Sequence, residues 1–237
     1  VRMWYAIFNF SMSHLILHRV LGSPPARAVM MLSELLKLQL QFNDVKLLQG
    51  EHKSPEFKKL NPMGTVPVLQ DGDFVVSESH AIMKYLLSVY GGDKSESLYP
   101  SDVRTRALVD QAMFFNAGVF FRAFTNVTRD TFLGVVSEPT RQHVEEIESS
   151  FEVVDAYVRH RPYIATDHLT IADLAAGSTA AAMLVFHKPD PDKFPRCVDW
   201  VSRLEDEHVF KTIMTPGVVY FTKVMKALWK RNRENKE

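Results

Sequence analysis

The sequence is poor in several features that would point to particular functions. Its 237 residues contain a single cysteine, Cys197, which excludes an intrachain disulfide and any metal site built from cysteines alone. Lys and Arg together number 28, as do Asp and Glu, so the zero net charge gives no bulk attraction to nucleic acid or to an anionic membrane. The longest apolar run, residues 174–186, is shorter than the about 20 residues of a membrane span. The histidines show no metal-ligand spacing, so no metal is expected.

Residues 1–11 are apolar but short, and Arg2 is their only charge. They lack the basic start and small-residue cleavage site of a secretory signal. Met12 begins a segment with the pattern of an ordinary protein start. We therefore interpret residues 1–11 as an N-terminal extension that need not be native, with a signal anchor as the alternative.

Residues 12–92 alternate between strand and helix patterns. Short apolar runs bounded by turn residues predict the strands, and apolar residues at helical spacing predict the helices. The expected strands are residues 14–19, 41–46, 65–69 and 74–76, and the expected helices are residues 26–38, 51–60 and 79–89. The predicted order is β-α-β-α-β-β-α, which suits a small α/β domain.

The rest of the chain has a different character. Residues 93–101 belong to a polar stretch rich in Gly and Ser and are predicted to be a linker. Residues 102–237 show helical patterns and almost no strand signal. The expected helices are residues 103–124, 140–159, 170–186, 197–206 and 219–231. The predicted fold is an α/β domain followed by an all-helical domain.

The strongest local signals are the segments NPMGTVPVL (residues 61–69) and ESHAI (residues 78–82). Pro67 among strand-forming residues predicts a sheet edge or a bend, for which a cis Val66–Pro67 bond is one solution. The free backbone groups of such an edge can pair with an extended peptide. The helix start at Glu78 and Ser79 favours an anion, and Glu78 can accept an ammonium group. The pattern therefore suits a small peptide with a carboxylate and an amine, unless Glu78 and Ser79 only cap the helix.

These segments resemble the glutathione transferase superfamily, and the resemblance covers nearly the whole chain from Met12. The two motifs are similar to the glutathione-binding half of that family, and residues 98–100, 107–111 and 115–119 are similar to its helical half. The resemblance implies a thioredoxin-like N-terminal domain and a C-terminal helical bundle that carries the hydrophobic substrate site. Thr170 and Asp173 resemble the family's helix-capping box, which is structural.

Within the superfamily the sequence is most similar to the insect epsilon class, with the delta class second. The similarity lies in Ser23-Pro24-Pro25-Ala26-Arg27, Gly50-Glu51-His52 and the VDQxxxFxxGV pattern of residues 109–119. It implies that Ser23 is the catalytic residue, whose hydroxyl donates to the glutathione sulfur. The position suits this role, because N–H groups and the dipole of a helix start favour a thiolate. The alternative is that Ser23 is a simple N-cap.

The resemblance also assigns the contacts to glutathione. It places His52 at the glycine end, the backbone of Val66 against the cysteinyl part, and Glu78 with Ser79 at the γ-glutamyl end. The glutathione-binding residues are then His52, Gly64, Thr65, Val66, Pro67, Glu78, Ser79 and His80. Epsilon and delta members usually carry a histidine at the position of Gly64. The loss of one hydrogen bond to a charged group, about 1.5–3 kcal/mol, predicts weaker glutathione binding.

A hydrophobic second-substrate site is expected by the same resemblance. Its residues are Leu21, Pro24, Asn116, Val119, Phe121, Phe124, Thr125 and Thr128. Phe114 and Phe115 are assigned mainly to packing, because aromatic residues at helical spacing usually face a core. Asn116 stands where several relatives carry an acid, so it can hydrogen-bond a hydroxyl but cannot anchor a sterol-like ligand by charge.

The resemblance implies a cytoplasmic, homodimeric glutathione transferase that uses glutathione as co-substrate. The expected reaction is conjugation of glutathione to hydrophobic electrophiles, as in xenobiotic detoxification and insecticide resistance, with glutathione peroxidase activity on the side. The alternative is a carrier of hydrophobic ligands on the same fold, which the change at Gly64 keeps open. A thiol-disulfide oxidoreductase is disfavoured because no cysteine lies near Ser23. Cys197, although expected at a helix start, is interpreted as a structural thiol.

Overall fold

A four-stranded sheet organises the N-terminal half of the chain. The computed structural model describes residues 15–235. The strands are β1 (Leu15–Arg19), β2 (Gln41–Asp44), β3 (Val68–Asp71) and β4 (Phe74–Ser77). They are ordered β2-β1-β3-β4, with β1 and β2 parallel and the other pairs antiparallel. This mixed sheet and the order of its helices confirm the predicted thioredoxin-like domain.

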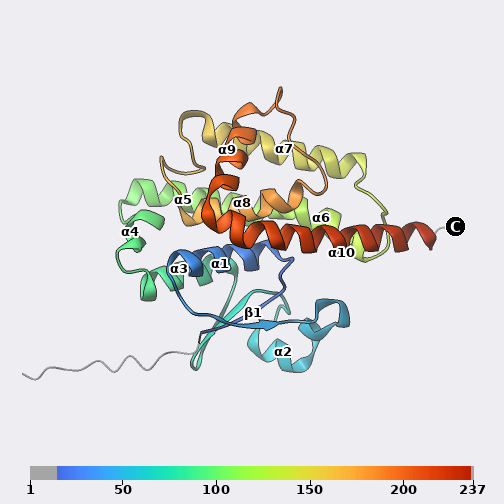
Figure 1. Cartoon of the computed structure of the whole chain (residues 1–237), viewed down its shortest axis with the longest axis horizontal. Coiled ribbons are helices and arrows are strands. Elements are labelled where there is room, and N and C mark those ends of the chain that lie inside the picture. The colour runs from blue at the N-terminus through green and yellow to red at the C-terminus, as the bar shows by residue number, and fades with distance from the viewer. Residues whose placement is uncertain (1–14, 236–237) are drawn as a thin grey trace, which may run out of the picture.

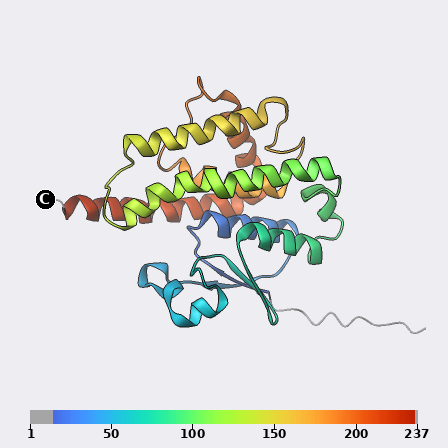
Figure 2. The same cartoon turned by 180° about the vertical axis from the view of Figure 1, so that it is seen from behind.

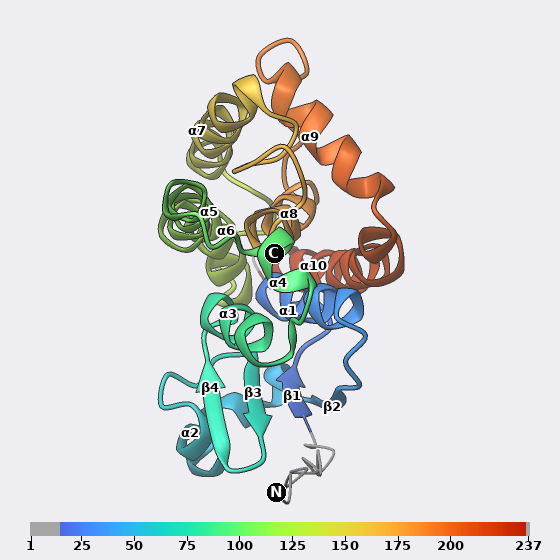
Figure 3. The same ribbon diagram turned by 90° about the vertical axis from the view of Figure 1, so that its left-hand side faces the viewer.

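Helices cover both faces of this sheet. The helices α1 (Pro24–Leu35) and α3 (Ser79–Tyr90) lie between the sheet and the helical half of the molecule, as Figure 3 shows. On the other face lie the short segments η1 (Leu47–Gln49), η2 (Glu51–Lys53) and α2 (Pro55–Leu60). Phe57 of α2 packs there with Val45 and Val68 in a small second core.

The C-terminal half is entirely helical in the part that the structure describes. Its elements are α4 (Lys94–Leu98), α5 (Val103–Phe115), η3 (Asn116–Phe120), α6 (Phe121–Phe132), α7 (Arg141–Tyr157), η4 (Val158–His160), α8 (Ile171–Met183), α9 (Pro195–Asp206), η5 (Phe210–Met214) and α10 (Thr215–Glu234). The long helix α10 runs across the width of the molecule, along the side of the helical half that faces the sheet domain (Figure 1). Viewed from behind, α5 and α6 form one long rod that is joined through η3 (Figure 2).

One apolar core runs through both halves. It joins Leu17 and Leu86 of the sheet domain to Phe120 and Trp200 of the helical half. Helix α8 lies at its centre and is almost completely buried, which explains why the longest apolar run of the sequence falls there. Gly177 allows this packing, since a Cβ there would lie 2.6 Å from Leu204 Cδ1. Among the described helices, none is long and apolar enough to cross a membrane.

Several element boundaries differ from the sequence-based prediction. Strand β3 begins at Val68 rather than at residue 65, because the preceding segment forms a turn that ends in a cis Val66–Pro67 bond. The helix expected over residues 103–124 continues to Phe132 through the π-helical turn η3. Helix α10 begins at Thr215 rather than at residue 219, because a proline is tolerated in a first helical turn. Residues 93–101, predicted to be a linker, contain α4. The predicted extension, residues 1–11, lies outside the described residues.

Candidate functional site

The register of the sheet brings the predicted site segments to one end of it. Val68, the first residue of β3, is paired with His18 near the end of β1 and with Ser77 at the end of β4. The turn with Ser23 follows β1, the cis peptide precedes β3, and Glu78 follows β4. Parallel pairing with β1 sends β2 toward the same end, and His52 comes after it. The sheet therefore gathers four segments that are distant in the sequence.

Ser23 lies at the N-cap position of α1, yet its hydroxyl makes no cap hydrogen bond. Two prolines, Pro24 and Pro25, follow it and have no N–H to donate. The Ser23 N–H donates to the Val20 carbonyl at 2.9 Å, and the Arg27 N–H donates to the Ser23 carbonyl. Among residues 23–27, only the Ala26 N–H is therefore left without a partner. The hydroxyl is free for another partner, whereas backbone support for an anion is weaker than the sequence suggested.

A network around Asn61 shapes the turn before β3. The Asn61 amide donates to the carbonyl and the hydroxyl oxygens of Thr65, both at 2.9 Å, and its Oδ1 accepts from Met63 N at 3.1 Å. The Val66–Pro67 bond that follows is cis, which confirms the bend expected at Pro67. The alternative, a sheet edge, is wrong because β3 lies between β1 and β4. These contacts hold the backbone of Val66 at the sheet end, next to β1.

Gly64 has a structural reason to be glycine. Its φ is +60°, and a Cβ there would lie 2.5 Å from the His52 carbonyl oxygen. Lys53 Nζ donates to the carbonyls of Gly64 and Met63 at 3.1 and 3.3 Å and ties η2 to this turn. Burial, and then the charge of Lys53, lower the pKa of His52, whose buried Nδ1 has no partner. The imidazole therefore presents neutral nitrogens here.

Helix α3 begins with an unusual backbone geometry. Glu78 has a φ of +70°, in the region that favours glycine, and its side chain does not cap the helix. The carboxylate is exposed, and Ser79 follows as the first helical residue. A helix start without a side-chain cap leaves backbone N–H groups free for a carboxylate ligand. The helix start thus offers N–H donors for a carboxylate, and the Glu78 carboxylate beside them can bind an ammonium group.

His80 and Asn116 connect α3 to the π-helical turn η3. Asn116 Nδ2 donates to His80 Nε2 at 3.1 Å, and Asn116 is 6% exposed. Burial, followed by the charge of Lys84, lowers the pKa of His80 to about 4, so this ring is neutral at pH 7. His80 therefore offers no positive charge to a ligand. Asn116 Oδ1 is buried without a partner, so the amide keeps a free acceptor at the junction of the two domains.

The residues predicted to line a hydrophobic site fall into different environments. Phe121 stacks on Phe124 with ring centroids 5.5 Å apart, and Phe124 packs on Phe221 of α10 at 5.4 Å. The hydroxyls of Thr125 and Thr128 donate to carbonyls of their own helix. Val119 is 51% exposed. Phe124 thus belongs to the core as well as to the predicted site.

The packing role assigned to Phe114 is wrong in the described chain. Phe114 is 74% exposed, whereas Phe115 is buried and stacks on Phe120. The two neighbours face different sides of α5 because consecutive helical residues lie about 100° apart. The sequence did not reveal this difference, because five phenylalanines within eleven residues give no clear apolar face.

Tyr220 was missed by the sequence analysis. Its ring lies beside Gly22, since a Cβ at Gly22 would be 3.2 Å from Tyr220 Cδ1. Tyr220 is 43% exposed and places an aromatic surface next to the turn with Ser23. The sequence predicts a last helix from residue 219, but nothing in it places that helix beside the turn that follows β1. Of the predicted residues in this turn, Leu21 is half-buried and Pro24 is buried at the start of α1, so Tyr220 is the exposed apolar side chain that α10 adds beside it.

The remaining predicted residues are structural. Thr170 and Asp173 form a buried capping box at the start of α8. Cys197 is buried, and burial together with Asp155 raises the pKa of its thiol to about 12, which confirms an inert thiol. Within residues 15–235, no group of three or more His, Cys, Asp or Glu side chains is placed to hold a metal ion.

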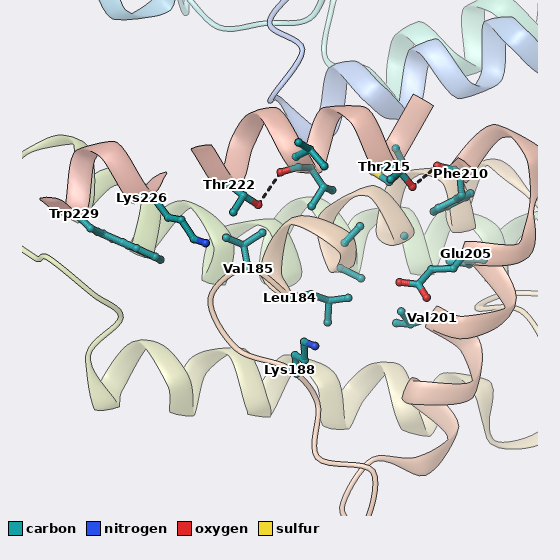
Figure 4. A pocket seen from close by; sticks show the side chains of 17 residues that line it. Leu184, Val185, Lys188, Val201, Glu205, Phe210, Thr215, Thr222, Lys226 and Trp229 are labelled. Atoms are coloured by element: carbon teal, nitrogen blue, oxygen red, sulfur yellow. Dashed lines mark hydrogen bonds between the residues drawn. The ribbon is translucent and has the colours of Figure 1, made fainter. Parts of the chain in front are cut away.

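A cavity of about 510 Å³ lies elsewhere, between α8, α9, η5 and α10 (Figure 4). Leu184 and Val185 belong to its apolar lining, with Lys188, Glu205 and Lys226 around them. Its lining includes none of the predicted glutathione or substrate residues. The candidate site is therefore the sheet end with Ser23, not this cavity.

Comparison with known proteins matches both halves of the chain. Residues 13–88 match the family described as glutathione S-transferase, N-terminal domain, and residues 118–207 match its C-terminal domain. "Glutathione S-transferase 1" of Manduca sexta is 36% identical over 203 residues, which cover 85% of this chain and 92% of that protein.

Two solved structures are similar over most of the chain. An epsilon-class glutathione S-transferase from the housefly, Musca domestica, superposes with a TM-score of 0.86 at 33% identity, covering 90% of this chain and 98% of that one. A glutathione transferase homologue from Drosophila mojavensis, solved with bound glutathione, has a TM-score of 0.85 at 36% identity, covering 91% and 98%.

Proposed function

Because this chain belongs to the glutathione S-transferase family, with insect epsilon- and delta-class structures among its relatives, we propose that it conjugates glutathione to hydrophobic electrophiles with Ser23 as the catalytic residue. The Ser23 hydroxyl donates to the glutathione sulfur and favours the thiolate over the thiol. The thiolate attacks an electrophilic carbon. A carbon–sulfur bond forms, and the leaving group departs with the electron pair of its broken bond.

The free hydroxyl of Ser23 carries this proposal. A serine at an N-cap usually accepts from a backbone N–H of the first helical turn. Here the following prolines remove two such donors, and the hydroxyl makes no cap bond. It is therefore available at the sheet end where the other site segments gather.

The same geometry supports the glutathione contacts that we propose. The backbone of Val66, held by the cis peptide, pairs with the cysteinyl part of the peptide. Glu78 accepts the γ-glutamyl ammonium, and Ser79 with the α3 N–H groups receives its carboxylate. His52 lies at the glycine end as a neutral hydrogen-bonding group. Because Lys53 is tied to the Gly64 and Met63 carbonyls, it does not replace the histidine that relatives carry there.

The hydrophobic substrate binds between the Leu21–Pro24 turn and helices α6 and α10. Phe121, with Tyr220, supplies the aromatic surface, whereas Asn116 is buried against His80 and takes no direct part in binding. Detoxification of xenobiotics, including insecticides, and reduction of hydroperoxides are the activities that such a site would serve.

A retention and turnover assay tests the function. We expect the protein to bind immobilised glutathione and to conjugate glutathione to a general aromatic halide, with activity that saturates in both substrates. Retention without turnover would support the alternative, a carrier of hydrophobic ligands. Absence of both retention and turnover would contradict the transferase proposal.

A homodimer is the expected assembly, and the exposed aromatic residues support it. Figure 3 shows β4, α3 and α5 along one side of the molecule. On these elements Phe74 is 45% and Phe114 74% exposed, and Phe74 packs on Tyr85 of α3 with ring centroids 4.8 Å apart. Aromatic side chains are enriched in the interfaces between chains, and these two lie on elements along one side of the molecule.

Sedimentation analysis tests the dimer. We expect the mass of two chains for the unmodified protein and of one chain for Phe114→Glu, because a carboxylate would be buried unpaired in the interface. Leu133→Glu, at another exposed apolar residue beyond α6, should remain dimeric. A dimeric Phe114→Glu variant would show that the interface lies elsewhere.

A further inference from the structure

Arg27, four residues after Ser23, carries a guanidinium group that is buried without a counter-ion. Its exposed fraction is 0%, and no carboxylate of the described residues pairs with it. Nη1 donates to the Gly22 carbonyl at 3.1 Å, and Nε donates to Met214 Sδ at 3.1 Å. Nη2 is buried without any partner. A buried, unpaired charge is costly for folding, so its presence requires an explanation.

The fold holds this cation in place from both domains. Met214 belongs to η5 and Gly217 to the first turn of α10. A Cβ at Gly217 would lie 2.3 Å from Arg27 Cδ and 3.1 Å from Nη1, so only glycine leaves room for the side chain. Burial lowers the pKa of Arg27 to about 9, which leaves it protonated at neutral pH.

We propose that Arg27 is a positioning residue that supplies the positive potential for the glutathione thiolate at Ser23. This inference rests on the proposed function of Ser23. The guanidinium acts through the turn, because Nη1 binds the carbonyl oxygen of the peptide bond that joins Gly22 to Ser23.

The start of α1 explains why such a charge is needed. A helix start normally offers several N–H groups to an anion. Pro24 and Pro25 remove two of them, and the Ser23 N–H is occupied by Val20. The uncompensated charge of Arg27 supplies the positive potential that the missing N–H groups of Pro24 and Pro25 would have provided. A counter-ion beside Arg27 would cancel this potential.

The experiment measures the pKa of the bound glutathione thiol from the ultraviolet absorbance of its thiolate, with S-methylglutathione as the blank. A unit charge roughly 8–10 Å from a titrating group shifts its pKa by on the order of one unit at an effective dielectric constant of about 20. We therefore expect Arg27→Met and Arg27→Gln to raise the thiol pKa by about one unit. The acid limb of kcat/KM should move with it, whereas activity at high pH should approach that of the unmodified protein.

Two further variants separate charge from packing. Arg27→Lys keeps a positive charge and should restore at least half of the shift. Arg159→Met removes an exposed arginine of the helical half and should leave the thiol pKa unchanged. If Arg27→Met does not fold, Arg27→Gln, which retains a donor for the Gly22 carbonyl, decides the question.

An unchanged thiol pKa in a neutral Arg27 variant that binds glutathione would overturn the inference and leave a merely structural arginine. That result differs from a failure of the proposed function. If the proposed function failed, the unmodified protein itself would bind no glutathione, or would show no thiolate that depends on Ser23.

Discussion

Replacing Ser23 by alanine should lower kcat/KM for conjugation by about 100-fold while glutathione still binds. The hydroxyl is the donor that the structure leaves free at the sheet end, and removing one preorganised donor to a developing or bound anion typically costs 10²–10³ in rate. Glutathione affinity should change little, because the γ-glutamyl and cysteinyl contacts come from α3 and from the backbone of Val66. Steady-state kinetics and calorimetric titration with glutathione measure the two effects separately.

Ser54 provides a matched control for this substitution. It is also a serine at the N-cap of a helix that starts with proline, but its hydroxyl accepts from Phe57 N at 3.1 Å. Ser54→Ala should therefore cost about 1 kcal/mol of unfolding free energy and leave the thiolate unaffected. Ser23→Ala should show the reverse pattern. A Ser23→Ala variant with unchanged turnover would refute the catalytic role.

The order of strands and helices in the N-terminal half could be predicted because glycine and proline separate its elements. The boundary of β3 could not, since residues 65–67 have strand-forming side chains but belong to a turn with a cis bond. The π-helical turn η3 was also not predictable. A π-helical turn inserts a single extra residue, which leaves the apolar periodicity of α5 and α6 nearly unchanged.

The candidate site divides in the same way. Segments that follow or precede strands could be assembled from the sequence, because the sheet carries them to a common end. Contacts made by α10 could not, since nothing in the sequence links Tyr220 to Gly22 or Met214 to Arg27. Arg27 itself would be expected at the surface, because arginine is rarely buried unless it is paired.

Replacing Asp173 by alanine should be the most destabilising of the changes considered, at about 3–5 kcal/mol of unfolding free energy. The side chain is fully buried and accepts from Ile164 N at 2.8 Å, from Trp200 Nε1 at 3.0 Å, and from both the N–H and the hydroxyl of Thr170 at 3.0 Å. Burial raises the pKa of Asp173, and these donors oppose that rise. Without the carboxylate, four buried donors lose their acceptor, and each costs about 1–3 kcal/mol before the structure relaxes.

Urea unfolding measures this loss, and two variants identify its origin. Thr170→Ala removes the hydroxyl donor itself, so no buried donor is left without an acceptor. It should cost only about 1 kcal/mol of unfolding free energy. Asp173→Asn keeps the shape of the side chain and one acceptor oxygen, so it should fall between the two. Since Asp173 lies away from the sheet end, the folded fraction of each variant should retain the glutathione affinity of the unmodified protein. An Asp173→Ala variant that loses less than about 1 kcal/mol would mean that water or backbone movement satisfies the four donors, and that the box does not hold the start of α8.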